Sequence, residues 1–456
     1  MKNYILRPDE LAANGITTVI IATPDLQGRL VGRRIPISGF ERVIERGVEI
    51  CTCAWAWDID QTSDLIDAGV FKLCSMHNGV PDVTLKPDLS TLRRAAWLDG
   101  VAICLADPVD LHTAEPMSIS PRVILRQELQ RYHEAGFVPQ AGTELEFYLF
   151  LNEPRALRKQ GFRELEPTTS TPSDFLLHEG NNYEGFFQKL RGDLEASGIE
   201  MEAAQSEWGT GQWEMTFVYG DPLEMADRHA LYKLAVRDSA AAAGMSVTFM
   251  ARPLNGQPGS SCHIHFSLLD QAHNSLFWDD EGQYRMSKTM RSAIGGALEH
   301  ASSFMTWYAP TINSYRRTNS RDVAGHGRTW GHENRSVTAR VVGTRQSDLR
   351  FEFRLPGADT NPYLALSGLL ASARDGMQRK ASPPEESRGN SYDDPMDEPM
   401  PANLAEAADA FAAAPIVAEL IGAENQSHFA ILARYEWKLY QASVSSWDLE
   451  RYFDRI

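Results

Sequence analysis

The chain has 456 residues, with 44 basic and 61 acidic side chains and a net charge of −17. This length is too great for a single hydrophobic core and predicts two or three domains. The negative charge argues against nucleic acid as a partner, because a phosphate backbone would be repelled overall, and favours chemistry on small molecules.

Cysteine usage and hydropathy indicate the compartment. The five cysteines are an odd number spread thinly, which argues against a disulfide framework and for a reducing environment. The N-terminus lacks a signal-peptide pattern, and no stretch approaches the roughly 18 apolar residues of a membrane helix. We therefore expect a cytoplasmic protein that does not insert into a membrane.

Short strand-like runs separated by Gly, Pro and Asp turns fill the N-terminal part, with one helical stretch at 39–47. They predict a small α+β domain over residues 1–112. A polar connector then leads into a helix with Ser120 as its cap and Pro121 at its first position. A second, larger domain is therefore predicted over residues 113–456.

Helices alternate with strands in this larger domain. Asp221 and Asn361 are each followed by proline, a cap and first-turn signature that predicts helices over 221–244 and 361–377. The segment 382–403 is acidic and proline-rich with little to bury, and predicts a surface loop.

Two segments carry polar pairs at strand spacing: Glu144 and Glu146 in TELEFYLF, and His263 and His265 in HIHFS. Because side chains alternate along a strand, each pair points to one face. Alternating glutamates are typical of a solvated sheet face, but the apolar run after Glu146 favours burial, which is costly for a carboxylate without a cation. For the histidines, a core strand with one hydrogen-bonded imidazole is an equally good interpretation.

Three further carboxylates, Glu207, Glu214 and Glu352, have comparable settings. With Glu144, Glu146 and a histidine they offer enough ligands for two hard divalent cations such as Mg²⁺ or Mn²⁺. The pattern predicts chemistry on phosphate.

Arginines are concentrated between and beside the later carboxylates, at Arg316, Arg317, Arg335, Arg340, Arg350 and Arg354. Planar guanidinium groups suit carboxylate and phosphate oxygens, so the pattern predicts a pocket for both kinds of anion. The chain has no Walker A sequence and no GxGxxG, so a nucleotide would be held by metals, arginines and backbone amides. The absence of GxSxG gives no support to a serine nucleophile.

Five separated motifs, in their order along the chain, resemble the glutamine synthetase family: TELEF, Glu207 with GQxE, GSxxHxHxSL, NSYxR with NRxxxxRV, and FExRxPxxxxNPYL. The resemblance implies a β-grasp-like N-terminal domain, followed by a catalytic domain whose curved antiparallel sheet, surrounded by helices, forms a funnel open to ATP. It also implies a homo-oligomer, commonly a dodecamer of two stacked hexameric rings, with active sites shared between neighbouring subunits.

The resemblance assigns a role to each motif residue. It makes Glu146, Glu207 and Glu214 ligands of a metal near L-glutamate, and Glu144, His263 and Glu352 ligands of a metal on the ATP phosphates. It places His265, Ser267 and Arg340 on the nucleotide side, Gly259, Arg317 and Arg354 in the glutamate pocket, and Arg335 and Arg340 beside the transferring phosphate. These roles imply that ATP phosphorylates the γ-carboxylate of L-glutamate and that an amine then displaces phosphate.

Two departures from the family pattern bear on the amine. Glutamine-forming members carry a loop glutamate six residues after the arginine that corresponds to Arg317, and this chain has Val323 there. The DGSS signature that serves ammonium is also absent, and AWAWDIDQTSD stands at about its position. Asp58 is the best candidate for the missing aspartate, ahead of Asp60 and Asp64.

Loss of a carboxylate weakens a site for ammonium, while Val323, Trp55 and Trp57 favour an apolar substituent. We therefore predict ATP-dependent ligation of L-glutamate to a primary amine larger than ammonia, through γ-glutamyl phosphate, at the start of amine catabolism. Three alternatives stay open: glutamine synthesis from ammonium, a catalytically silent structural relative, and a two-metal hydrolase that works without ATP.

Overall fold

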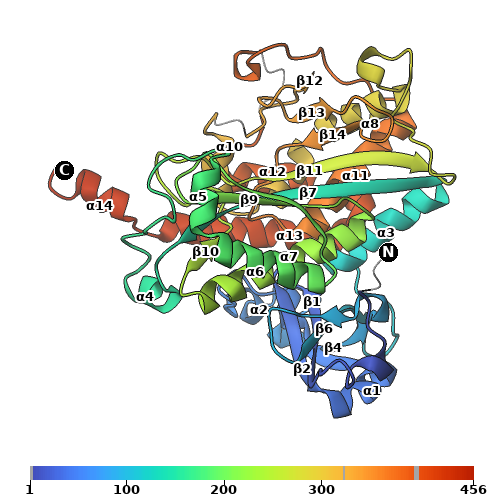
Figure 1. Cartoon of the computed structure of the whole chain (residues 1–456), viewed down its shortest axis with the longest axis vertical. Helices are drawn as coiled ribbons and strands as arrows, with labels where there is room; N and C mark the ends of the chain where they lie inside the picture. The colour runs from blue at the N-terminus through green and yellow to red at the C-terminus, as the bar shows by residue number, and fades with distance from the viewer. Residues whose placement is uncertain (1–3, 322–323, 395–399) are drawn as a thin grey trace.

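The structure is a computed structural model that describes residues 4–321, 324–394 and 400–456. Two separate β-sheets organise it, a smaller one from the N-terminal part of the chain and a larger one surrounded by helices (Figure 1). The larger sheet is curved and nearly closed. The predicted α+β fold class, a small N-terminal sheet followed by a larger part with a curved sheet surrounded by helices, is confirmed.

The N-terminal sheet, blue in Figure 1, follows the strand-like runs of the sequence. Its strands are β1 (Thr18–Pro24), β2 (Leu30–Pro36), β3 (Val48–Cys51), β4 (Asp82–Pro87), β5 (Arg93–Arg94) and β6 (Val101–Asp110). The order is β2-β1-β6-β4-β3, with β5 beside β6 and with β1 parallel to β6. Two helices accompany it, α1 (Ile37–Arg46) and the short α2 (Asp64–Asp67). The predicted domain boundary after residue 112 lies between β6 and the first helix of the larger part, and stays a prediction.

The larger sheet is built from strands far apart in the sequence. They are β7 (Phe137–Phe150), β8 (Met201–Ser206), β9 (Gln212–Phe217), β10 (Ser246–Thr248), β11 (Cys262–Asp270), β12 (Trp330–His332), β13 (Ala339–Val342) and β14 (Arg350–Phe353). Their order is β12-β13-β14-β11-β7-β9-β8, with β10 beside β7. All pairs are antiparallel except β12 with β13.

Helices cover the apolar side of this sheet and complete the chain (Figure 1). They are α3 (Pro121–Glu134), α4 (Pro154–Lys159), α5 (Leu177–Asn182), α6 (Glu184–Ala196), α7 (Pro222–Ala242), α8 (Lys288–Glu299), α9 (Met305–Tyr308), α10 (Ser314–Thr318), α11 (Pro362–Arg379), α12 (Leu404–Ala413), α13 (Pro415–Ala442) and α14 (Ser446–Tyr452). No helix in the described ranges is long and apolar enough to cross a membrane.

The predicted helix starts are confirmed. The Asp221 carboxylate accepts hydrogen bonds from the backbone of the first turn of α7, and the Asn361 side chain accepts one at the start of α11. Ser120 stands at the N-cap position of α3, with proline at the first helical position, but its hydroxyl forms no capping hydrogen bond. The predicted surface loop at 382–403 contains a single 3₁₀ turn among its described residues, and 395–399 lie outside them.

Strand alternation explains why the larger sheet has one apolar and one acidic side. Leu145 and Phe147 of β7 are fully buried in the hydrophobic core, and β7 packs against α7 on that side. Glu144 and Glu146 alternate with them and therefore point to the other face.

A buried ion cluster ties the N-terminal sheet to the helices. The Arg122 guanidinium, on α3, bonds Asp107 of β6 at 2.8 Å, Asp88 at 2.9 Å and Asp227 of α7 at 3.0 Å. Three carboxylates from separate parts of the chain therefore share one buried cation.

Candidate metal and phosphate site

Opposed strand positions gather the predicted metal ligands on one face of the larger sheet. Glu144 of β7 lies opposite His263 of β11, and Glu146 lies opposite Glu214 of β9. Glu352 of β14 lies opposite His265. Because directly opposed residues of antiparallel strands point the same way, the register places all these side chains on one face.

Glu144, His263 and Glu352 form the tightest group. His263 Nδ1 lies 3.3 Å from Glu144 Oε2 and 3.2 Å from Glu352 Oε1. One potential ligand atom from each residue lies within 4.8 Å of the others. Burial, and then the charge of Arg354, lowers the pKa of His263 to about 4, so its imidazole is neutral and has a lone pair for a metal.

His265 and Arg350 orient Glu144. The Arg350 Nε–H donates to His265 Nδ1 at 2.9 Å, and His265 Nε2 lies 2.7 Å from Glu144 Oε1. Since Nδ1 accepts, Nε2 carries the proton and donates it to the carboxylate. Such a relay fixes the orientation of a metal ligand. The sequence interpretation placed His265 on the nucleotide side and Arg350 in a general anion pocket, and it did not pair the two, because this contact depends on cross-strand packing.

Gln205 of β8 bridges the carboxylates of Glu207 and Glu214. Gln205 Nε2 donates to Glu207 Oε1 at 3.1 Å and to Glu214 Oε1 at 3.0 Å. Gln205 stands two residues before Glu207 in β8, so strand spacing alone could have identified it.

Glu146 is held by two neutral donors. Its Oε2 accepts from Gln212 Nε2 at 2.8 Å and from the Ser261 backbone N–H at 2.9 Å. Gln212 belongs to the GQxE motif, so the motif could have revealed this contact.

Carboxylates outnumber cations around Glu146 and Glu214, although the charges of Arg317 and Arg354 act on Glu146. Burial, and then the charge of Glu207, raises the pKa of Glu146 to about 8. Burial, and then the charges of Glu144, Glu146 and Glu207, raises the pKa of Glu214 to about 10. A bound divalent cation would supply the missing charge, and carboxylate oxygens are its preferred ligands, so the residues fit a metal.

Two of the predicted arginines flank Glu352. Arg340 lies opposite Glu352 in the sheet, and its guanidinium is 3.2 Å from Glu352 Oε2. Arg354 donates to Glu352 Oε1. Although burial opposes it, Arg354 and then His263 lower the pKa of Glu352 to about 2. Arg335, in contrast, is exposed in the loop between β12 and β13.

Gly259 and Arg317 pack directly against one another. A Cβ at position 259 would lie 2.6 Å from Arg317 Cγ and 2.7 Å from the Ala251 carbonyl oxygen, so only glycine fits there. The Arg317 guanidinium is buried and donates to Leu355 O and to Ser261 Oγ, each at 2.8 Å. Arg317 therefore holds the segment whose backbone binds Glu146, and its predicted contact with glutamate stays a prediction.

Ser267 and Tyr219 lie toward one end of this face. Ser267 follows His265 by two residues in β11 and is half-buried on the same face. Tyr219, which the sequence interpretation missed, is 60% exposed, and a Cβ at position 142 would contact the Cβ atoms of both Tyr219 and His265.

The structure places Asp58 away from the acidic face of its own chain. Asp58 accepts hydrogen bonds from the Thr62 backbone N–H at 2.8 Å and the Thr62 hydroxyl at 2.9 Å, and lines a cavity beside the N-terminal sheet. Trp55 is fully buried in the core, so it lines no open amine pocket within one chain. Val323 lies outside the described residues.

Comparison with known proteins identifies the family. The family model described as the glutamine synthetase catalytic domain matches residues 118–452 of this sequence. The chain belongs to the glutamine synthetase family. The predicted resemblance is therefore confirmed.

Several relatives match the chain over almost all of its length. It is 36% identical to the γ-glutamylethanolamide synthetase of Streptomyces coelicolor over 447 residues, 98% of this chain and 94% of that one. It is 31% identical to a glutamate–isopropylamine ligase of a Pseudomonas species over 459 residues, 100% of this chain and 99% of that one. It is 33% identical to type-1 glutamine synthetase 2 of Dictyostelium discoideum over 445 residues, 96% of this chain and 84% of that one.

Among solved structures, GmaS without ligand superposes with a TM-score of 0.84 at 26% identity, covering 98% of this chain and 99% of that one. The predicted likeness to the γ-glutamyl-amine-forming branch is confirmed by the first two relatives.

Proposed function

We propose that this protein is an ATP-dependent ligase that joins the γ-carboxylate of L-glutamate to a primary amine larger than ammonia. The observation that carries the proposal is the buried acidic face, where carboxylates and one histidine converge between Arg340 and Arg354. Family membership and the γ-glutamylethanolamide and isopropylamine ligases among the relatives support it.

The residues suit phosphoryl transfer to a carboxylate. Glu144, His263 and Glu352 would hold one divalent cation, and Glu146, Glu207 and Glu214 a second, with Mg²⁺ and Mn²⁺ both matching the donors. Bound cations would neutralise phosphate oxygens and the developing charge during transfer.

The remaining site residues have complementary tasks in this proposal. Arg340, with Arg335 beside it in the chain, would bind the transferring phosphate, and His265, Ser267 and Arg340 would line the nucleotide side. Arg354 and Gly259 would line the glutamate pocket, which Arg317 shapes from beneath. The product of the first step would be γ-glutamyl phosphate, and an amine would then displace phosphate.

The choice of amine rests on the sequence departures and the relatives. Val323 replaces a carboxylate that serves ammonium in glutamine-forming members, and two relatives are named for organic amines. Asp58 would bind the amine in the active site of a neighbouring subunit. The chain would form a cytoplasmic homo-oligomer, proposed as a dodecamer, and would catalyse the first step of amine catabolism. Glutamine synthesis from ammonium is the alternative that the type-1 glutamine synthetase among the relatives favours.

The test is phosphate release from ATP with L-glutamate and Mg²⁺ across a panel of ammonium, isopropylamine, ethanolamine and longer alkylamines. We expect turnover with at least one organic amine to exceed turnover with ammonium, with formation of the matching γ-glutamyl amide. Turnover with ammonium alone would establish the alternative, and phosphate release without ATP from a phosphate ester would indicate a hydrolase. No metal-dependent ATP turnover with any amine would indicate a silent relative.

A further inference from the structure

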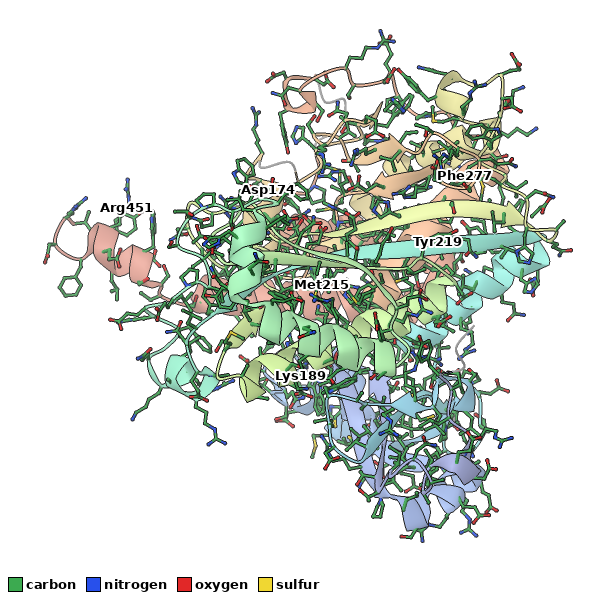
Figure 2. All side chains as sticks on the ribbon, in the orientation of Figure 1. Asp174, Lys189, Met215, Tyr219, Phe277 and Arg451 are labelled. Atoms are coloured by element: carbon green, nitrogen blue, oxygen red, sulfur yellow. The ribbon has the colours of Figure 1, made fainter. Side chains whose placement is uncertain are left out.

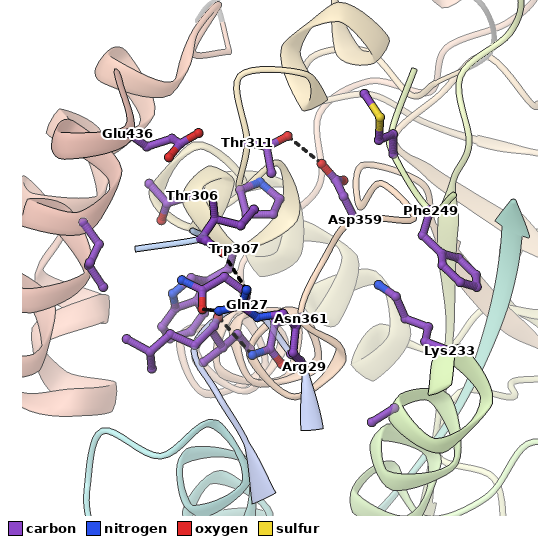
Figure 3. Close-up of a pocket in the computed structure, with 18 of the residues that line it drawn as sticks. Gln27, Arg29, Lys233, Phe249, Thr306, Trp307, Thr311, Asp359, Asn361 and Glu436 are labelled. Carbon is purple, nitrogen blue, oxygen red and sulfur yellow. Dashed lines mark hydrogen bonds between the residues drawn. The ribbon is translucent and has the colours of Figure 1, made fainter. Parts of the chain in front are cut away.

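A cavity of about 410 Å³ lies between the N-terminal sheet and helices α7, α9 and α13 (Figure 3). Among the described residues that line it, none is a predicted metal ligand of the acidic face. The segments that meet there come from both ends of the chain, from Gln27 to Glu436. The cavity is therefore distinct from the catalytic face.

One side of the cavity is cationic. Lys233 and Arg237 of α7 both stand over the Phe249 ring, at 5.2 Å and 5.5 Å from its centre. The Lys233 ammonium donates to the Ala358 carbonyl oxygen at 2.8 Å. Across the described part of the chain, neither cation forms an ion pair with a carboxylate. Burial, and then the charge of Arg237, lowers the pKa of Lys233 to about 8, while the charge of Asp359, a carboxylate that also lines the cavity, opposes this shift. Two cations and one carboxylate leave this side of the cavity net positive.

The opposite side is acidic. Glu436 of α13 lines the cavity with Asp58, and Figure 3 shows Glu436 across the cavity from Lys233. Burial, and then the charges of Asp58 and Asp60, raises the pKa of Glu436. Glu436 forms no ion pair within the ranges that the structure describes. Arg29, the third cation that lines the cavity, pairs with Asp25 at 2.7 Å and donates to the Ile59 carbonyl oxygen at 2.6 Å, so the charge of Glu436 stays unbalanced.

The wall between the two sides is apolar but includes two polar groups without a hydrogen-bond partner. Trp307, Phe429 and Leu432 line it. The Thr306 hydroxyl and the Trp307 indole N–H are buried and have no hydrogen-bond partner, although both residues face the cavity. Buried polar groups usually find a partner, so these two indicate a ligand or water that the protein itself does not replace.

We propose that this cavity binds a small zwitterion whose carboxylate and ammonium are separated by an apolar chain. The carboxylate would face Lys233 and Arg237, and the ammonium would face Glu436. A ligand with both charges neutralises both sides at once, whereas a simple acid or amine leaves one side without a partner.

The test is calorimetric titration of the full chain with straight-chain ω-amino acids of increasing length, without ATP, L-glutamate or metal. Each is compared with the carboxylic acid and the amine of the same chain length. We expect one length to bind about tenfold tighter than both of its single-charge analogues, which corresponds to about 1.4 kcal/mol. Absence of binding at millimolar concentration, or equal affinity for a single-charge analogue, would overturn the proposal.

Variants test which side of the cavity binds the carboxylate of the ligand and which side binds its ammonium. Arg237→Gln and Glu436→Gln are each expected to weaken binding of the best ω-amino acid by about tenfold. Matched controls are Arg451→Gln and Glu450→Gln on the projecting helix α14, labelled at Arg451 in Figure 2, which should leave binding unchanged.

Single variants that bind the zwitterion as tightly as the natural chain would contradict the assignment. The chain-length series on the natural protein stays decisive even where a variant folds poorly. The titrated ω-amino acids and amines are themselves primary amines, the substrate class of the proposed ligase. Loss of binding in Arg237→Gln and Glu436→Gln, at residues outside the acidic face, therefore distinguishes this cavity from the amine site, and failure of one proposal leaves the other standing.

Discussion

The cluster around Arg122 and the acidic face around Glu214 are both buried and rich in carboxylates, but they balance charge in different ways. Arg122 supplies an internal cation to Asp88, Asp107 and Asp227. Although burial opposes it, hydrogen bonds from Ser90 and Arg122 lower the pKa of Asp88 to about 2. Around Glu214, burial and neighbouring carboxylates raise the pKa to about 10 instead.

The difference distinguishes a structural cluster from a binding cluster. A carboxylate group whose charge is balanced within the chain contributes to the folded state and needs no ligand. A buried group of like charges destabilises the folded protein until a cation binds. Its presence therefore indicates a binding site for a cation. The predictions below test this distinction.

Glu214→Gln removes one carboxylate from the acidic face and should have the largest effect. We expect ligase activity to fall on the order of 1000-fold, because the variant loses a charge that holds a metal at the transferring group. The melting temperature of the metal-free variant should rise, since like-charge repulsion is relieved. Steady-state phosphate release and a thermal melt measure the two effects.

The exposed Glu202→Gln on β8 is the matched control and should change neither quantity. A Glu214→Gln protein with full activity would contradict the role of this face.

Arg122→Met tests the balanced cluster and should show the opposite behaviour. Removing the shared cation leaves Asp227 buried without its partner, which costs about 3 to 5 kcal/mol of unfolding free energy. The kinetic constants of the folded fraction should stay unchanged. Denaturant unfolding measures the loss.

Arg126→Met provides the control, because Arg126 contacts Asp88 and Asp107 at 3.1 Å and 2.8 Å but is 46% exposed. The Arg126→Met protein should lose less than about 1 kcal/mol of unfolding free energy. Equal losses for the two variants would refute the distinction drawn here.

Arg350→Gln should have an intermediate effect, because it loosens the relay through His265 to Glu144. We expect the affinity for Mn²⁺ to fall by roughly 10- to 100-fold, as for other residues that orient a metal ligand. Calorimetric titration with Mn²⁺ measures it, with the exposed Arg345→Gln as control. Unchanged Mn²⁺ affinity in Arg350→Gln would show that the relay does not orient the ligand.

The pH dependence of stability should be the smallest effect. The folded pKa values of Glu146 and Glu214, about 8 and about 10, lie above the ordinary value of 4.5. The folded state therefore holds these protons more tightly than the unfolded state, and the stability they contribute is full below about pH 4.5 and is lost as pH rises through 8 and 10.

We expect the melting temperature of the metal-free protein to fall between about pH 6 and about pH 9, and the gain on adding Mg²⁺ to grow over the same range. Melts at both pH values with and without Mg²⁺ measure this. A gain from Mg²⁺ that is the same at both pH values would contradict it.

Local patterns in the sequence predicted much of the acidic face. Strand spacing identified Glu144 with Glu146 and His263 with His265, because alternation is a property of a single strand. The register that sets Glu144 opposite His263 joins strands more than a hundred residues apart, and local alternation does not encode it. The order of the family motifs supplied that information.

Long-range packing explains what the sequence did not reveal. The burial of Arg317 under Gly259 and the contact of Arg350 with His265 depend on neighbours from other strands. The cavity that contains Asp58 is built from segments at both ends of the chain, so no single motif marks it.

The central claim is that the acidic face supports phosphorylation of the γ-carboxylate of L-glutamate. Its most direct test is mass spectrometry of the phosphate released from unlabelled ATP when the γ-carboxylate of L-glutamate carries ¹⁸O, with the best amine of the panel. We predict that each phosphate released with the γ-glutamyl amide carries one ¹⁸O atom. Released phosphate that contains no label would contradict the account.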